Sequence, residues 1–119
     1  MKNYILITLI FIGTTVYAQC AQQSKFETKG DLISATYFHD NGAIQQEGTF
    51  DKKGKLDGLW ISYNENGVKL SQGNYDKGLK TGKWFFWTEE SLKEVDYIDS
   101  RITNVNEWSS TSEMATNFK

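Results

Sequence analysis

The dipeptide Asn-Gly occurs twice, at Asn41-Gly42 and at Asn66-Gly67, and each copy lies between two runs that alternate polar with apolar residues. Asn-Gly in that setting indicates a tight hairpin turn, because a type I′ turn requires positive φ at both central residues. The two copies lie 25 residues apart. The sequence therefore predicts a β-hairpin that is repeated along the chain.

The residues around these turns recur as well. Phe50 corresponds to Tyr75, 25 residues on, and Tyr63 corresponds to Trp87, 24 residues on. A third and less regular copy spans residues 82–100, with Glu90-Ser91 in place of Asn-Gly. A fixed period in this range is the signature of a repeat array. The structural positions of the repeat are Gly42, Gly48, Gly58, Trp60, Gly67, Gly73, Tyr75, Gly78, Gly82 and Trp84.

Short loops between hairpins favour a meander in which neighbouring strands run antiparallel. We therefore expect an all-β fold over residues 32–108, a single antiparallel meander sheet of about six or seven strands built from three hairpin repeats. No apolar period of 3.6 residues predicts a helix anywhere after residue 20. Residues 19–31 and 109–119 are expected to be flexible tails. The expected strands are 33–39, 44–50, 59–64, 68–75, 83–88 and 92–98, with a seventh over 102–108.

The turn positions also predict which residues face each other. A two-residue turn at Asn66-Gly67 places Trp60 opposite Gly73, where the indole can cover the bare glycine backbone. The same register places Ala35 opposite Gly48, so we expect this glycine to have lost its tryptophan. In the third copy it places Tyr97 opposite Trp84.

The pattern G-x-W-x-x-Y-x-x-x-G followed by G-x-Y-x-x-G runs from Gly58 through Tyr63 to Gly78 and begins again at Gly82. It resembles the bacterial variant of the MORN (membrane occupation and recognition nexus) repeat, over about residues 36–100. Many bacterial proteins of this kind are named YwqK-type antitoxins. The resemblance implies a non-catalytic interaction or scaffolding module.

The N-terminus is typical of a secretory signal peptide over residues 1–18: Lys2 precedes an apolar run, and Val16-Tyr17-Ala18 forms a cleavage site. The mature chain is then expected to begin at Gln19 in the periplasm, outside the cell or at its surface. The alternative of a retained anchor is disfavoured because the apolar run falls short of about 18 residues. Lipid attachment at Cys20 is a second alternative, which Gln19 disfavours because the lipoprotein peptidase requires a small residue there; otherwise Cys20 is a free thiol.

Charge and composition narrow the function. The formal charge of −2 falls to −3 when Lys2 is removed, which argues against nucleic acid and against direct binding to anionic lipid. His39 beside Asp40 could begin a catalytic triad, but no nucleophile lies in a recognisable elbow, so an exposed turn histidine is the simpler interpretation. We therefore predict no enzyme, no cofactor and no metal site, since neither a zinc ligand set nor a calcium loop is present.

The aromatic residues remain as the candidate for function. Alternation along the strands places Tyr63, Phe85 and Trp87 on the face opposite Trp60 and Trp84. In one interpretation part of one face stays exposed and binds a ligand, with Tyr63, Phe85 and Trp87 as the candidate contacts. In the other, one row of aromatic residues is core and the second is covered by the aliphatic stems of neighbouring Lys and Gln side chains. We expect an exported, non-catalytic repeat module whose partner is another protein or a component of the cell envelope. The alternatives are a toxin-neutralising antitoxin or immunity protein and, less in keeping with the residues, an enzyme that uses His39.

Overall fold

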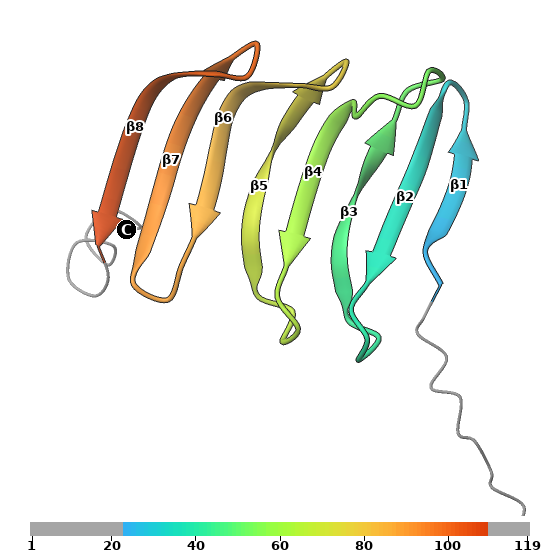
Figure 1. Cartoon of the computed structure of the whole chain (residues 1–119), viewed down its shortest axis with the longest axis horizontal. Coiled ribbons are helices and arrows are strands. Elements are labelled where there is room, and N and C mark those ends of the chain that lie inside the picture. The colour runs from blue at the N-terminus through green and yellow to red at the C-terminus, as the bar shows by residue number, and fades with distance from the viewer. Residues whose placement is uncertain (1–22, 110–119) are drawn as a thin grey trace, which may run out of the picture.

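The computed structural model describes residues 23–109, which form one eight-stranded sheet (Figure 1). The strands follow one another in chain order, each antiparallel to the next, so the predicted antiparallel meander is confirmed and the described residues contain no helix. The predicted signal peptide, Cys20 and residues 110–119 lie outside the described residues. The strands are β1 Lys25–Lys29, β2 Leu32–Phe38, β3 Ile44–Phe50, β4 Gly58–Tyr63, β5 Lys69–Asp76, β6 Leu79–Trp87, β7 Ser91–Ile98 and β8 Arg101–Ser109.

The expectation of six or seven strands is corrected to eight, because β1 lies within residues 19–31, which were expected to form a flexible tail. All five of its residues are exposed, so its sequence carries no buried face that would reveal a strand. β1 is held by its ladder with β2 and by an edge-on contact between the rings of Phe26 and Tyr37, 5.9 Å apart. The seventh predicted strand is present as β8.

The Asn-Gly turns differ from the predicted type I′ geometry. At the second turn only Gly67 has positive φ, and the Asn64 side chain accepts hydrogen bonds from the N–H groups of Asn66 and Val68. The result is a three-residue loop that ends in a glycine bulge, a common hairpin connection. Paired positive φ values occur instead at Lys77-Gly78 and at Asp99-Ser100, where two-residue turns join β5 to β6 and β7 to β8.

Two registers also need correction. β6 begins at Leu79 rather than at residue 83, because the turn-rich segment before Gly82 pairs with β5 across a bulge near Gly73. In the third hairpin Trp84 faces Val95, and Tyr97 faces Gly82. The turn there is centred on Glu89-Glu90, since Thr88 N–H donates to the Ser91 carbonyl, and this shifts the predicted pairing of Tyr97 with Trp84.

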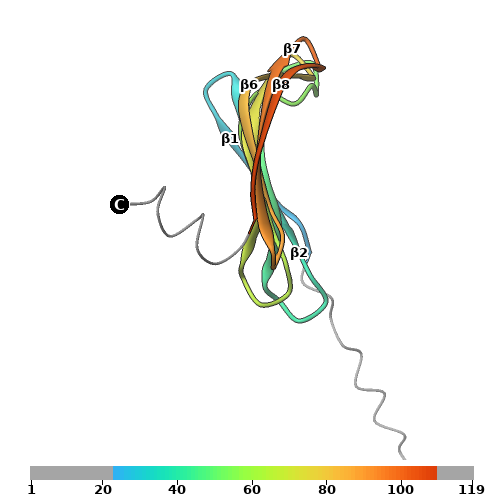
Figure 2. The same cartoon turned by 90° about the vertical axis from the view of Figure 1, so that its left-hand side faces the viewer.

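One row of directly facing residues crosses the whole sheet and holds much of its core. We call it the tryptophan row, its side of the sheet the tryptophan face and the other side the opposite face. Ala35, Trp60, Trp84 and Val95 within the row are buried, whereas its two ends on β1 and β8 are exposed. Seen edge-on, the sheet is a single twisted layer (Figure 2). The row runs Phe26, Ala35, Gly48, Trp60, Gly73, Trp84, Val95 and Val105.

The tryptophans of this row join one hairpin to the previous one. The Trp60 indole lies against Gly48 so closely that a Cβ there would overlap the ring, and its N–H donates to the Thr49 carbonyl at 2.9 Å. Trp84 repeats this arrangement over Gly73, donating to the Asn74 carbonyl at 3.1 Å. The predicted backbone pairing of Trp60 with Gly73 is confirmed. The expectation that the Trp60 indole covers Gly73 is wrong, and Gly48 does have its tryptophan.

Hydrogen bonds at both rims of the sheet also link successive hairpins. At one rim His39 Nε2 lies 2.8 Å from the Tyr63 carbonyl, in the turn of the next hairpin. At the other rim Gly78 N–H donates to the Leu56 carbonyl and Ser100 N–H donates to the Lys80 carbonyl. These contacts recur with the repeat, so Leu56 and Lys80 occupy equivalent positions.

Candidate functional site

The three predicted ligand contacts lie on the opposite face and are all half-buried. Phe85 and Trp87 in β6 stack on each other, with ring centroids 5.9 Å apart and planes 23° apart. Tyr63 lies two strands away at the end of β4. The opposite face therefore holds one stacked aromatic pair and one separate tyrosine rather than a continuous strip of the three.

Tyr63 is bound to its own sheet. Its hydroxyl donates to Glu47 Oε1 at 3.0 Å, across the junction between β3 and β4. Partial burial raises the pKa of Tyr63 above 10.0, and the hydrogen bond and the charge of Glu47 raise it further. The neutral phenol is thus favoured, and it offers a ring held in one orientation.

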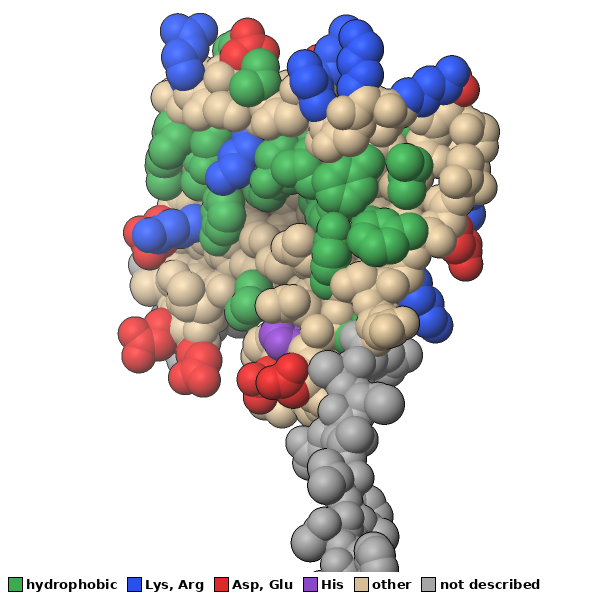
Figure 3. Space-filling view, turned by 45° about the vertical axis from the view of Figure 1, so that its right-hand side comes forward, with side chains coloured by type: hydrophobic (Ala, Val, Ile, Leu, Met, Phe, Trp, Pro, Cys, Tyr) green, Lys and Arg blue, Asp and Glu red, His purple; other side chains and the backbone are tan. Residues whose placement is uncertain are grey.

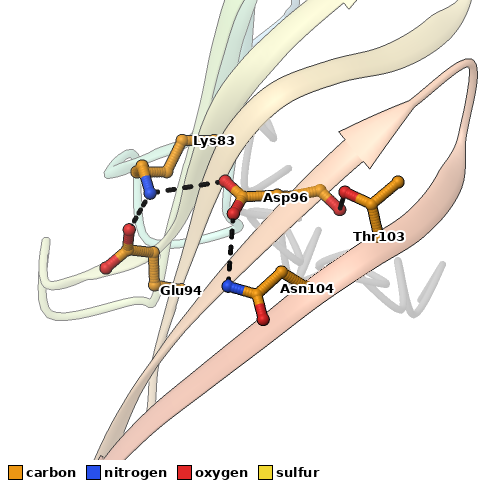
Figure 4. Close-up of polar contacts among 5 residues, drawn as sticks. All are labelled: Lys83, Glu94, Asp96, Thr103 and Asn104. Atoms are coloured by element: carbon orange, nitrogen blue, oxygen red, sulfur yellow. Dashed lines mark hydrogen bonds and ion pairs between the residues drawn. The ribbon is translucent and has the colours of Figure 1, made fainter.

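A charged cluster lies beside the aromatic pair. Lys83 Nζ contacts Glu94 and lies 3.3 Å from Asp96 Oδ1 (Figure 4). The hydrogen bond to Glu94 is the main cause that raises the pKa of Lys83 above 10.5. Asp96 is also approached by Asn104 Nδ2 at 3.5 Å and its carbonyl accepts from Thr103. Phe85 pairs directly with Glu94, so aromatic and acidic groups adjoin on this face.

The tryptophan face carries a second arrangement, which sequence reasoning missed. Lys80 Nζ lies 5.1 Å from the Trp84 ring, 5.8 Å from the Phe86 ring and 5.1 Å from the Tyr97 ring. Lys80 falls between the expected strands 68–75 and 83–88, so the sequence does not predict its alignment with Trp84 and Phe86 on one strand. Figure 3 shows hydrophobic side chains gathered in a band across one side of the molecule, with a basic side chain inside the band and acidic groups at its margins.

Between Trp60 and Trp84 the tryptophan face is hollowed by about 110 Å³. Ser62 and Ser71 line the hollow and hydrogen-bond each other at 2.5 Å, so their hydroxyls are already paired. Both tryptophans are at least 95% buried and offer little open ring surface, with 5% and 3% exposure respectively. The hollow is therefore a gap in packing over the sheet rather than an aromatic platform.

Groups for catalysis are sparse in the described part of the chain. His39 bonds to a main-chain carbonyl in the neighbouring turn. Among residues 23–109 no three His, Cys, Asp or Glu side chains converge as metal ligands. Within that same range no helix has the length and hydropathy needed to cross a bilayer.

A model of the MORN repeat variant matches residues 33–52 and 56–77. These segments contain β2 with β3, and β4 with β5, the two hairpins that share the Asn-Gly turns. Over these two segments the chain is similar to the MORN repeat variant. No curated protein and no solved structure matches the chain.

The third hairpin lies outside both matched segments but keeps part of the geometry of the preceding hairpins. Trp84 covers Gly73 as Trp60 covers Gly48, and Tyr75 contacts Trp84 as Phe50 contacts Trp60, with centroids 5.0 Å apart in both cases. The later half of this hairpin departs from the repeat, since Val95 stands where the second hairpin has Gly73.

Proposed function

We propose that this protein is an exported, non-catalytic MORN-variant module that binds another protein or a component of the cell envelope. The observation that carries the proposal is the stacked pair of Phe85 and Trp87, half-exposed on an open sheet. Trp60 and Trp84 already provide buried packing on the other face. Exposed aromatic rings that are fixed in orientation bind partners at a low cost in conformational entropy.

The charge cluster beside Phe85 limits the partner. Glu94 and Asp96 lie there, and Lys83, which contacts both, offsets only part of their charge. Like charges repel, so nucleic acid and anionic lipid are poor ligands for this surface. A partner with an apolar patch bordered by basic groups complements it.

Export rests on the N-terminal sequence, with Lys2, the apolar run and the cleavage site at Val16-Tyr17-Ala18. Intact-mass measurement of the protein recovered from the envelope tests it, with a chain that begins at Gln19 as the expected result. Acyl chains on Cys20 would instead identify a lipoprotein.

The binding role is tested by affinity capture with the purified mature protein as bait on the envelope fraction. We expect one or a few retained components that are lost with Phe85→Ala/Trp87→Ala. They should be kept with Val68→Ala, which truncates a side chain that is 58% exposed in a turn. Equal capture by the three proteins would exclude the opposite face as the binding surface.

The antitoxin alternative has one specific source, the resemblance of the repeats to proteins that carry that name. It requires a toxin that acts outside the cytoplasm if export is correct. Co-expression with an exported product of a neighbouring toxin gene, with and without Phe85→Ala/Trp87→Ala, separates neutralisation from simple binding.

A further inference from the structure

Lys80 and Lys83 lie on the same strand but in different electrostatic surroundings. Lys83, on the opposite face, contacts Glu94 and Asp96. Lys80, on the tryptophan face, has no ion pair among the described residues, and its ammonium group lies over aromatic rings. The strand residues of β3 to β7 place no acidic side chain on that face, so the described groups around the Lys80 ammonium are aromatic rings.

The rings form a cage around the ammonium group. The Trp84 and Phe86 rings stack with planes 20° apart, and Tyr97 stands at 76° to Trp84. All three centroids lie within 6 Å of Lys80 Nζ, the range in which the negative face of an aromatic ring attracts a cation. Rings that converge on one point in this way are the usual means by which proteins recognise quaternary ammonium groups.

The preceding repeat shows that packing alone does not require a cation here. Leu56 is the equivalent of Lys80: each lies four residues before a tryptophan, and each carbonyl accepts a hydrogen bond from the next turn. Leu56 lies beside Trp60, so an aliphatic side chain is sufficient to pack at this position. That repeat has Ser62 in place of Phe86, so its site lacks the second ring of the cage.

We propose that Trp84, Phe86 and Tyr97 form a binding site for a quaternary ammonium group, and that Lys80 is its internal occupant. The Lys80 backbone is fixed, since its N–H donates to Ser100 Oγ and its carbonyl accepts from Ser100 N–H, both at 2.9 Å. The Lys80 side chain can move away from the three rings without breaking an ion pair. A quaternary ammonium competes well because a primary ammonium is strongly hydrated and gains more from returning to water.

The first experiment compares choline with its neutral isostere 3,3-dimethylbutan-1-ol. Tryptophan fluorescence of the mature protein and of Lys80→Ala is followed during each titration. Removal of the internal occupant should tighten choline binding about tenfold and leave the alcohol without measurable binding, because only the cation gains from the rings. Equal binding of choline and the alcohol to Lys80→Ala overturns the proposal.

Two variants act as matched controls. Leu56→Ala opens the equivalent place beside Trp60 and should gain no choline binding, since Ser62 supplies no ring there. Phe86→Ser, added to Lys80→Ala, copies the preceding repeat and should remove the gain. Equal choline binding by Leu56→Ala and Lys80→Ala would mean that any opened gap suffices, which contradicts a cage.

A measurement on the unaltered protein guards against loss of folding in Lys80→Ala. The ε-methylene protons of Lys80 should resonate upfield because of the rings and return toward the position of a free lysine as choline saturates the site. Absence of this movement overturns the proposal. If phosphatidylcholine vesicles cause the movement and phosphatidylglycerol vesicles do not, the quaternary ammonium group that binds is a lipid headgroup. If only free choline and a trimethyllysine peptide cause it, the group comes from a soluble molecule or a protein. Because the cage lies on the tryptophan face, its failure leaves the role of Phe85 and Trp87 untouched.

Discussion

The two faces of the sheet use the same residue types for different purposes. On the tryptophan face the indoles of Trp60 and Trp84 are buried, and each reaches back to a glycine of the preceding strand. On the opposite face Phe85 and Trp87 stack with each other and remain half-exposed. An aromatic ring in a single-layer sheet thus becomes core when its neighbour on the facing strand is a glycine that it can cover.

This difference explains why the hairpin is repeated. A single two-stranded ribbon buries too little surface to be stable in water. Here each tryptophan packs on the hairpin before its own, so the stabilising contact forms only when two repeats are adjacent. Stability then follows a sum of repeat terms and neighbour terms, as in other repeat arrays.

The largest expected effect is the loss of a buried indole. Trp84→Ala and Trp60→Ala should each lower the free energy of unfolding by about 3–5 kcal/mol, the usual cost of truncating a buried tryptophan. Small domains have only about 5–15 kcal/mol in total, so either variant should be close to unfolded. Urea unfolding followed by circular dichroism measures this, and an unchanged midpoint would show that the faces have been assigned the wrong way round.

Trp87→Ala sharpens the comparison from the other face. Its ring is only half-buried, so we expect a loss of roughly 1–2 kcal/mol, below that of Trp84→Ala. The same denaturation experiment on both variants gives the ratio directly. A larger loss for Trp87→Ala would mean that the opposite face holds the true core.

Tyr63→Phe removes a single contact of the opposite face, the hydrogen bond to Glu47. A cost of about 0.5–1.5 kcal/mol is expected. Because the pKa of Tyr63 is raised above 10.0, folding favours the neutral phenol, and its contribution holds below pH 10.0 and is lost as the pH rises through the raised pKa. The variant should therefore lose less stability than the natural protein above pH 10.0, which thermal unfolding across that range can check.

The smallest effect concerns Lys83. The Glu94 hydrogen bond is the main cause of its raised pKa, so Glu94→Gln should bring the pKa of Lys83 back toward 10.5. NMR titration of its side-chain resonances detects the change. The contribution of the ion pair to folding is present below pH 10.5 and is lost as the pH rises through the raised pKa of Lys83. An unchanged pKa of Lys83 in Glu94→Gln would contradict the assigned cause.

Much of the fold could be predicted because the repeat fixes the period and alternation fixes the faces. Trp60 and Trp84 were placed correctly on one side and Phe85 on the other, since side chains alternate along any strand. β1 could not be found this way, because it buries no side chain and is held by its neighbour. The side-chain rotamer and the twist of the sheet decide which neighbouring strand an indole covers. The sequence therefore predicts that Trp60 pairs with Gly73, but it does not predict that the Trp60 ring covers Gly48. The cage around Lys80 could not be predicted for a related reason, since it depends on the bulge that brings residues 79–82 into β6.

The central claim is that the Trp84 indole, from the next hairpin, leaves no room for a side chain at position 73. Trp60, which faces Gly73 within the same hairpin, does not impose this restriction. A double-mutant cycle tests this by measuring the unfolding free energies of Gly73→Ala alone, in Trp84→Val and in Trp60→Val. Alone, the added methyl group overlaps the Trp84 indole and should cost about 1–3 kcal/mol. That cost should vanish in the Trp84→Val background and persist in the Trp60→Val background. Relief by Trp60→Val instead of Trp84→Val would show that the tryptophans act within hairpins and would contradict the account.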